Sequence, residues 1–149
     1  MRAGAFAALL LAACGMTDRP TPPAAPAPAV GGTPAVLAGT SWRVIEVEGR
    51  PAAGPTMGFR DGRIFGSTGC NRYTGGTTAE AEMDGQSGRL ATPPLATTRM
   101  ACPEPAMAVE RAFLEALERA DRWRLTAEGE LELAAGGQVV IRAQPAPAA

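Results

Sequence analysis

The chain has 149 residues, 46% of them hydrophobic, and its 14 basic and 15 acidic residues leave a formal charge of −1. This length suits one small domain, and the charge balance provides no basic surface of the kind that holds nucleic acid. The sequence contains neither histidine nor lysine, which excludes an imidazole base, Ser-His and Cys-His nucleophile pairs, and a lysine Schiff base. We therefore expect a protein that is not an enzyme and that uses no cofactor or metal ion.

The N-terminus has the pattern of a signal peptide. Arg2 precedes an apolar run over residues 5–13, which is too short to cross a bilayer. The sequence Leu11-Ala12-Ala13-Cys14 resembles the bacterial lipobox, in which the cysteine thiol receives a diacylglycerol before the chain is cut in front of it. An ordinary secretory signal with a chance cysteine is the alternative. We predict that residues 1–13 are removed and that Cys14 carries covalent lipid, including palmitate.

The residue after this cysteine bears on the membrane in which the anchor lies. It is Gly15, whereas an aspartate here resembles an inner-membrane retention signal of some enteric bacteria. We therefore expect the protein at the periplasmic face of the outer membrane, in contact with the membrane through its lipid anchor.

Two segments of low complexity flank the part of the chain that is expected to fold. Residues 14–36, rich in proline and alanine, show neither helical nor strand periodicity, which predicts a disordered tether with polyproline character. Fully extended, it would reach about 60 Å from the membrane. Residues 144–149 have a similar composition and predict a short disordered tail. A single domain over residues 37–143 remains.

Alternating hydrophobic residues predict strands in the first half of this domain. The strand over 42–47 is expected to turn Trp42, Val44 and Val47 toward the core. Segments 57–60 and 63–66 flank Asp61-Gly62, which predicts a hairpin with a type I′ turn because glycine tolerates positive φ. Two further strand candidates are 77–83 and 89–95. Pro93 and Pro94 limit the pairing of the segment 89–95 to one end.

The second half begins with a predicted helix and ends in a predicted meander. Val109, Phe113 and Leu117 recur at helical spacing within 106–120, and Glu115 lies four residues before Arg119, the favoured order for an ion pair. Trp123 is expected in the core. The three predicted strands that follow the helix are 122–126, 130–133 and 138–142.

Cys70 and Cys102 remain as thiols once Cys14 carries lipid. In an oxidising compartment we expect them to form a disulfide, which would stabilise the fold by about 3 to 4 kcal/mol. The alternatives are a reversible redox pair and a two-cysteine metal site. The redox pair lacks CxxC spacing and any lysine or histidine to lower a thiol pKa, and the metal site lacks nearby ligands. We therefore expect a structural bridge.

Several short segments recur together in one known family. They are Gly39-Thr-Ser-Trp42, Gly66-Ser-Thr-Gly-Cys-Asn-Arg-Tyr-Thr-Gly75, Thr97-Thr-Arg-Met-Ala-Cys102, Glu110 near the start of the helix, and Leu131 with Leu133 in the closing strands. In these segments the domain resembles the META domain, the family of the HslJ heat-shock lipoprotein, over nearly all of 37–143. The resemblance implies an α+β fold: a strongly curved antiparallel sheet, or small partial barrel, with one packed helix. Such proteins are linked to heat shock, novobiocin resistance, and secretion or motility, without a shared reaction or ligand.

The motif residues have a structural interpretation. Gly69 and Gly75 would supply backbone freedom, Asn71 would hold a turn through its side chain, and Arg72 and Tyr73 would cover the end of the sheet. The alternative interpretation is a ligand site. Its candidate polar binding cluster is Asn71, Arg72, Thr98 and Arg99.

These patterns favour a lipid-anchored, non-enzymatic envelope protein. We expect it to support tolerance of heat or antibiotic stress by binding another envelope component, an unidentified envelope protein. The alternative is a small barrel that binds an apolar small ligand, which would need an interior larger than its side chains fill.

The lipobox gives the first testable prediction. The mature chain should start at Cys14 and carry acyl groups, because the thiol is the acceptor of the lipid. Mass spectrometry of the protein from its native envelope measures both features. The variant Cys14→Ala should remain unprocessed or unanchored, and a mature N-terminus elsewhere would contradict the assignment.

Overall fold

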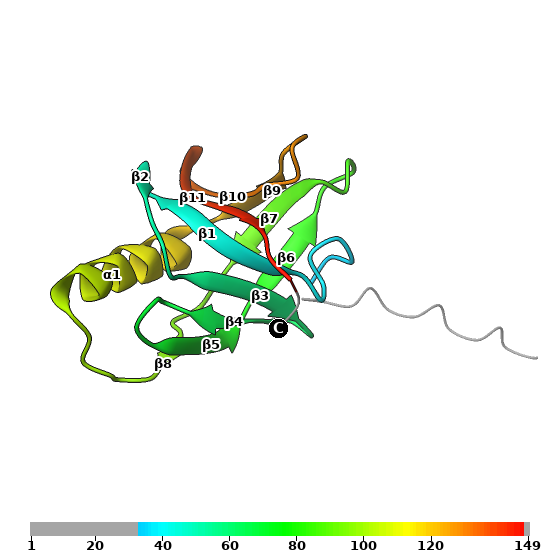
Figure 1. Ribbon diagram of the computed structural model, residues 1–149. Coiled ribbons are helices and arrows are strands. Elements are labelled where there is room, and N and C mark those ends of the chain that lie inside the picture. Colours follow the sequence, from blue (N-terminus) through cyan, green and yellow to red (C-terminus); the bar gives the residue numbers. More distant parts are fainter. Residues whose placement is uncertain (1–32, 148–149) are drawn as a thin grey trace, which may run out of the picture.

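A computed structural model describes residues 33–147 of the protein as a curled antiparallel sheet with one helix at its end (Figure 1). The predicted signal peptide, Cys14 and most of the predicted tether lie outside the described residues. The strands are β1 (Ser41–Val47), β2 (Arg50–Pro51), β3 (Thr56–Arg60), β4 (Arg63–Ser67), β5 (Arg72–Gly76), β6 (Thr78–Ala81), β7 (Ser87–Ala91), β8 (Ala96–Thr97), β9 (Arg122–Leu125), β10 (Leu131–Ala135) and β11 (Gln138–Pro145), and the helix is α1 (Glu104–Arg119).

The sheet forms a half-barrel in which every pairing is antiparallel. Its strand order is β6-β7-β9-β10-β11-β1-β3-β4-β5-β8, and β2 pairs with β1 beside this path. Thr77, the residue between β5 and β6, connects the two sides: its N–H donates to Gly62 O (2.9 Å) and its hydroxyl to Ala91 O (3.2 Å). The curved antiparallel sheet with one packed helix confirms the predicted fold class.

The predicted hairpin is present between β3 and β4. Asp61 and Gly62 have φ angles of 51° and 69°, and two consecutive positive φ angles are what a type I′ turn requires. Glycine adopts this conformation without steric cost, and a short aspartate tolerates it. The local sequence therefore determines this turn.

A bulge in β1 explains how its buried residues can be three apart. The register shifts between Val44 and Glu46, so the intervening residue is unpaired against β11. A bulge bends the strand and increases its twist. Trp42, Val44 and Val47 are consequently all buried, as predicted, and the sheet curls at this point.

Other strands were predicted with shifted bounds or not at all. The candidates at 77–83 and 89–95 correspond to the shorter β6 and β7, and Pro93 and Pro94 lie beyond β7. The meander of β9, β10 and β11 is confirmed. Strands β2, β5 and β8 were missed. β5 was missed because Thr74, Gly75 and Gly76 leave little hydrophobic alternation to detect.

The predicted start of the C-terminal tail at residue 144 is wrong. Gln144 and Pro145 extend β11 and pair with β1, and the Ala146 N–H donates to Ser41 O (2.8 Å). The last strand is central in the sheet, between β10 and β1, so its partners keep it ordered. The predicted tether also ends earlier than expected, because the hydroxyl of Thr33 accepts a hydrogen bond from Gly62 N (3.2 Å).

Helix α1 packs against the ends of β1, β10 and β11. It begins two residues before the predicted start, since Pro105 fits the first turn, where no N–H partner is needed. Phe113 and Leu117 are fully buried. Arg119 forms its ion pair with Glu48, in the turn between β1 and β2, not the predicted one within the helix. Within residues 33–147, no helix is both long and apolar enough to cross a membrane.

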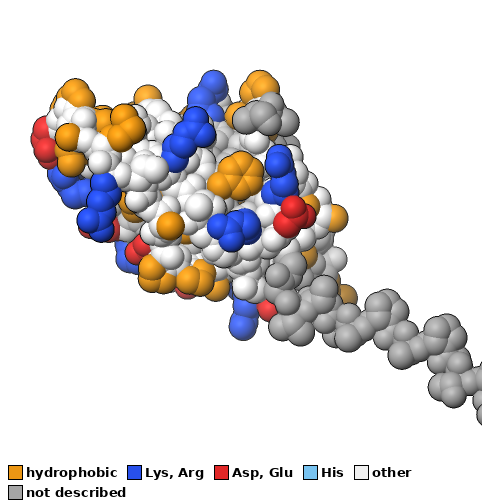
Figure 2. Space-filling model, turned by 90° about the horizontal axis from the view of Figure 1, so that it is seen from below, with side chains coloured by type: hydrophobic (Ala, Val, Ile, Leu, Met, Phe, Trp, Pro, Cys, Tyr) orange, Lys and Arg blue, Asp and Glu red, His pale blue; other side chains and the backbone are white. Residues whose placement is uncertain are grey.

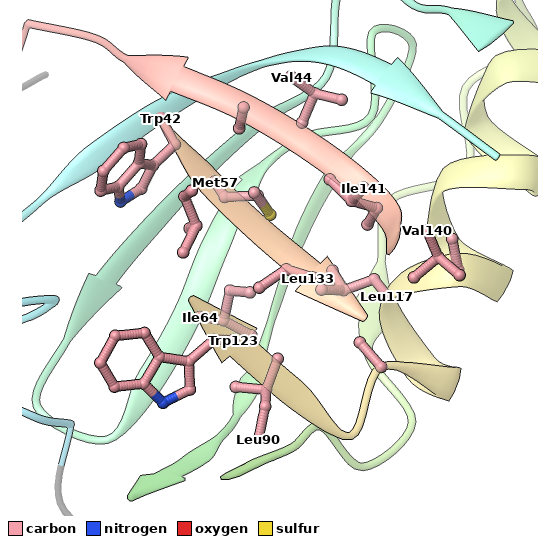
Figure 3. Packing of buried hydrophobic residues seen from close by; sticks show 14 of the residues in the cluster. Trp42, Val44, Met57, Ile64, Leu90, Leu117, Trp123, Leu133, Val140 and Ile141 are labelled. Atoms are coloured by element: carbon pink, nitrogen blue, oxygen red, sulfur yellow. The ribbon is translucent and has the colours of Figure 1, made fainter. Parts of the chain in front are cut away.

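The interior of the half-barrel is filled with hydrophobic side chains (Figure 3). Trp42 and Trp123 are 5% and 1% exposed, which confirms both as core residues, and Trp123 Nε1 donates to Glu80 O (3.0 Å). Burial of each large side chain stabilises the fold by about 1.5 to 3 kcal/mol. The core runs from Leu37 to Ala143 as one cluster, so the described residues form a single folding unit.

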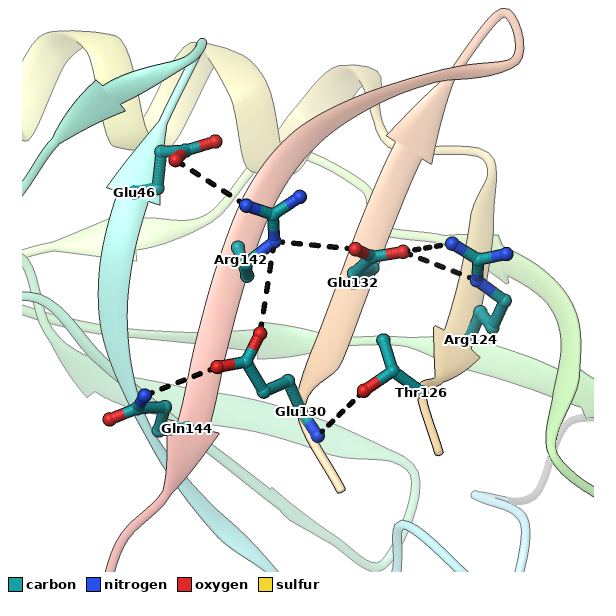
Figure 4. Close-up of polar contacts among 7 residues, drawn as sticks. All are labelled: Glu46, Arg124, Thr126, Glu130, Glu132, Arg142 and Gln144. Carbon is teal, nitrogen blue, oxygen red and sulfur yellow. Dashed lines mark hydrogen bonds and ion pairs between the residues drawn. The ribbon is translucent and has the colours of Figure 1, made fainter. Parts of the chain in front are cut away.

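On the opposite face of the sheet, charged residues of alternating sign lie side by side on four strands (Figure 4). Glu46, Arg142, Glu132 and Arg124 are register partners across β1, β11, β10 and β9. Arg142 lies 3.5 Å from Glu46 and 3.3 Å from Glu132, and Arg124 Nε donates to Glu132 at 3.2 Å. Opposite charges at directly paired positions stabilise the sheet and oppose a slip in register.

The second prediction concerns Glu132, whose side chain is only 8% exposed. Its pKa lies below the ordinary 4.5, mainly because the Arg124 side chain donates a hydrogen bond to its carboxylate. A carboxylate whose pKa is lower in the folded chain than in the unfolded chain stabilises the fold at pH values above its unfolded pKa. This stabilisation is lost as the pH falls through the folded pKa. Glu132→Gln should therefore lower the free energy of unfolding by about 1 to 2 kcal/mol at neutral pH.

Urea unfolding as a function of pH tests this expectation. The difference between Glu132→Gln and the parent should shrink below pH ~4. Glu128, exposed in the turn between β9 and β10, provides the control Glu128→Gln, which should stay close to the parent. A Glu132→Gln cost that persists unchanged in acid would contradict an electrostatic origin.

Candidate functional site

The motif segments meet where the half-barrel faces the start of the helix. Cys70, just before β5, forms a disulfide with Cys102, just before α1, and their Cα atoms are 6.0 Å apart. The predicted bridge is thus confirmed. It joins two loops that each carry part of the family-like sequence.

Asn71 lies at the centre of this region and is 3% exposed. Its Oδ1 accepts hydrogen bonds from the Met100 N–H (2.7 Å) and the Thr98 hydroxyl (2.9 Å). Its Nδ2 donates to the Glu110 carboxylate (3.0 and 3.2 Å) and to Met100 O (3.3 Å). The predicted turn-holding role is therefore too narrow, because this amide connects the sheet, the 98–102 loop and the helix.

Thr68 and Glu110 complete the same hydrogen-bonded group. The hydroxyl of Thr68, a fully buried residue, donates to Glu110 and accepts from Asn71 N (2.8 Å) and Cys70 N (3.3 Å). We call Thr68, Asn71, Thr98 and Glu110 the polar hub. Sequence reasoning assigned no contact to Thr68 or Glu110, because 42 residues separate them and no local pattern reports such a pairing.

The predicted polar cluster divides between two environments. Asn71 and Thr98 belong to the polar hub, and Thr98 also pairs with the Arg72 backbone: Arg72 N donates to Thr98 Oγ1 (3.0 Å) and Thr98 N to Arg72 O (2.9 Å). The side chains of Arg72 and Arg99 are exposed. Two of the four residues thus hold the fold and two remain accessible.

The remaining motif residues have specific packing roles. Gly69 has φ 93°, as expected for a residue that supplies backbone freedom. Gly75 packs under Leu95: a Cβ there would lie 2.5 Å from the end of the Leu95 side chain, which would have to shift. Tyr73 faces the core, where its ring meets Phe113 edge-on at 5.6 Å, and burial raises the pKa of its hydroxyl. Arg72, next to it in the strand, is exposed and points to the opposite face.

A shallow groove of about 530 Å³ lies between the polar hub and the surface. Met100, which is 62% exposed, is at its edge. In Figure 2 hydrophobic side chains gather over the side of the molecule where α1 and the preceding loop lie. The groove is lined by Asn71, Leu95, Thr97, Thr98, Arg99, Met100, Ala101, Met107, Glu110 and Leu114.

A second hollow, of about 490 Å³, lies over β6, β7 and the start of β9 and is lined largely by charged residues such as Glu80, Arg89 and Asp121. Within residues 33–147, no three cysteine, aspartate or glutamate side chains come together as metal ligands.

Comparison with known proteins identifies relatives of this fold. The profile of the META domain matches residues 35–147. An NMR structure of a protein from Burkholderia xenovorans is 27% identical, with a TM-score of 0.57, over 87% of this chain and 99% of that one. A second NMR structure is 29% identical, with a TM-score of 0.54, over 74% of this chain and 92% of that one. None of the curated proteins matches the chain significantly.

The third prediction tests the polar hub with a nearly isosteric change, Asn71→Asp. It replaces the amide donor by a carboxylate oxygen facing Glu110 and Met100 O, so the free energy of unfolding should fall by about 2 to 4 kcal/mol at neutral pH. Two adjacent carboxylates raise the folded-state pKa of the pair, so the cost should grow as the pH rises from about 4 to 7.

Denaturant unfolding between these pH values measures the effect. Asn71→Ala removes the same hydrogen bonds without adding charge, and its cost should depend much less on pH. Identical pH profiles for the two variants would show that repulsion from Glu110 is not the cause.

Proposed function

The chain belongs to the META domain family, and from this membership we propose that it is a lipid-anchored, non-enzymatic protein of the bacterial envelope. In this proposal the domain supports tolerance of heat or antibiotic stress by binding another envelope protein. The lipobox at Cys14 supports the anchor and the assignment to the periplasmic face of the outer membrane.

The internal pairing of the motif's polar groups carries the non-enzymatic part of the proposal. Asn71, Thr68 and Glu110 bond to one another, and within residues 33–147 every buried side-chain nitrogen or oxygen has a hydrogen-bond partner. A catalytic group, in contrast, presents an available polar atom to a cleft that admits substrate. The family-like motif is therefore best explained as a support for the fold, which leaves function to the exposed surface.

The groove beside the polar hub is the surface best suited to a protein partner. Met100 is 62% exposed, yet its backbone N–H and carbonyl are both held by the Asn71 side chain. Because the backbone here is already fixed, a partner that covers Met100 has to order the Met100 side chain but not the loop. Leu95, Met107 and Leu114 extend the apolar lining, and Arg99 supplies a charge. This arrangement is typical of a small protein-binding site with an apolar centre.

The alternative function, an apolar ligand inside the sheet, gains no support from the described residues. The side chains that would have to make room, including Phe59, Ile64 and Leu133, are fully buried in the core. Opening a cavity there would remove packing that the domain needs.

The fourth prediction tests the partner-binding proposal in cells. A photo-crosslinking amino acid at Met100 should give one reproducible adduct in intact envelopes. Met83, the other large hydrophobic residue that is highly exposed in the described part, lies between β6 and β7 and serves as the matched control position. Met100→Arg should lower survival under heat or novobiocin without lowering the amount of folded protein, and Met83→Arg should not.

Two results would count against the proposal. Adducts of equal yield at both positions would indicate random contact, and full survival of Met100→Arg would show that the groove is not needed for stress tolerance. A turnover assay of the purified domain against hydrolase and oxidoreductase substrates would address the enzyme class directly.

A further inference from the structure

Four arginines lie on the outer face of neighbouring strands β1, β3, β4 and β5, with Arg60 and Arg63 paired at one end of these strands and Arg43 and Arg72 nearer the other. They alternate with residues that face the core: Arg43 follows Trp42, Arg60 follows Phe59, and Arg63 precedes Ile64. Because successive side chains of a strand point to opposite faces, these arginines project outward. The same argument applies to Arg72, which precedes the buried Tyr73.

None of these four arginines takes part in an ion pair among the described residues. Arg43 bonds to the Gln144 side chain (3.3 Å) and Arg63 to the Thr74 hydroxyl (3.1 Å). In contrast, ion pairs with glutamate involve five other arginines, which are Arg111, Arg119, Arg122, Arg124 and Arg142. On the outer face of the sheet, the arginines of β9 and β11 thus form ion pairs with glutamates, whereas the arginines of β1, β3, β4 and β5 form none in the described part of the chain.

An aromatic ring lies among these arginines. Phe65 of β4 projects outward between its register partners Gly58 of β3 and Thr74 of β5. Its ring lies over Gly58, where a Cβ would be 2.7 Å from the ring. The Arg60 guanidinium is 5.6 Å from the ring centroid. Seen from below in Figure 2, basic side chains are spaced around hydrophobic ones on this side of the molecule.

The surrounding positions do not cancel this charge. The other outward residues of these strands include the uncharged Ser41, Thr56, Gly58, Ser67 and Thr74, and also Glu46 of β1, which pairs with Arg142. Asp61, in the β3–β4 turn, is the acidic residue that adjoins Arg60. We call Arg43, Arg60, Arg63, Arg72 and Phe65 the arginine face.

The arginine face also adjoins the point where the chain from Cys14 reaches the fold. Thr33 accepts a hydrogen bond from Gly62 N (3.2 Å), and Gly62 lies in the turn between Arg60 and Arg63. A lipid anchor at Cys14, 19 residues before Thr33, would therefore be joined to the domain by a tether that enters the fold beside this face and can bring the face to the membrane.

We propose that the arginine face docks on the anionic phospholipid headgroups of the membrane that holds the anchor. The guanidinium group forms paired hydrogen bonds with phosphate oxygens and is always charged. Phe65 adds an apolar contact of the kind that favours the membrane interface. This docking rests on the proposed lipid anchor. The anchor would keep the domain near the membrane and so raise the local concentration of headgroups, so that weak contacts are enough for the face to dock.

Vesicle co-sedimentation of the chain from Gly15 to Ala149 tests the face without the anchor. This chain retains every residue of the single folding unit described above and lacks both Cys14 and the apolar signal segment. It should bind vesicles that contain about one third phosphatidylglycerol, bind pure phosphatidylcholine vesicles much less, and dissociate as salt is added.

Matched double variants separate the arginine face from overall charge. Arg60→Gln with Arg63→Gln should weaken partitioning by about 25-fold, since each basic residue near an anionic surface contributes about fivefold. The control is Arg50→Gln with Arg89→Gln, which removes the same charge from exposed positions on β2 and β7 and should change partitioning less than threefold. Arg60→Lys with Arg63→Lys should retain most of the binding. Equal thermal unfolding of all variants shows that the fold is intact.

Three outcomes would overturn the proposal. The first is equal binding to vesicles with and without phosphatidylglycerol, and the second is an equal loss of vesicle binding in both double glutamine variants. The third is binding to duplex DNA that is as tight as binding to vesicles and depends on Arg60 and Arg63, which would indicate a general polyanion site. Because this chain lacks Cys14, these outcomes concern the arginine face alone, whereas mass spectrometry of the native protein decides on the anchor.

Discussion

The side-chain amide of Asn71 is the interaction on which the arrangement of sheet and helix depends. It is a donor and an acceptor at once, so it can hold the Met100 backbone and the Glu110 carboxylate together while Thr98 bonds to its oxygen. Buried polar groups of this kind are costly unless every bond is made. The polar hub makes these bonds, and in doing so places α1 at the end of the half-barrel.

The disulfide and the polar hub act on the same junction by different means. The bond between Cys70 and Cys102 limits the freedom of the unfolded chain, which stabilises the fold without directing it. The hydrogen bonds of Asn71 are directional and select one orientation of the 98–102 loop. A bridge alone would leave the helix free to adopt several positions, and the hydrogen bonds alone would have to order a longer loop.

Because the motif is used internally, the outer surfaces can serve separate purposes. The groove beside Met100 lies at the helix end of the molecule, whereas the arginine face follows strands β1 and β3 to β5. The row of alternating charges Glu46, Arg142, Glu132 and Arg124 crosses β1, β11, β10 and β9, where glutamates and arginines pair with one another. In our proposals one surface meets the membrane and another meets a partner, a division that a lipid-anchored domain makes possible.

The sequence by itself determined the features that depend on neighbouring residues. The Asp61-Gly62 turn, the hydrophobic face of α1, the final meander and the pairing of the two remaining cysteines follow from local geometry or from the count of thiols. The resemblance to the META domain supplied the curved sheet, which local patterns could not. Tertiary structure alone decided that β11 continues through Pro145, since a strand between two partners stays ordered whatever its composition. It also decided that Thr68, Asn71 and Glu110 meet, because a hydrogen bond across 42 residues depends on how the chain folds and leaves no trace in local sequence.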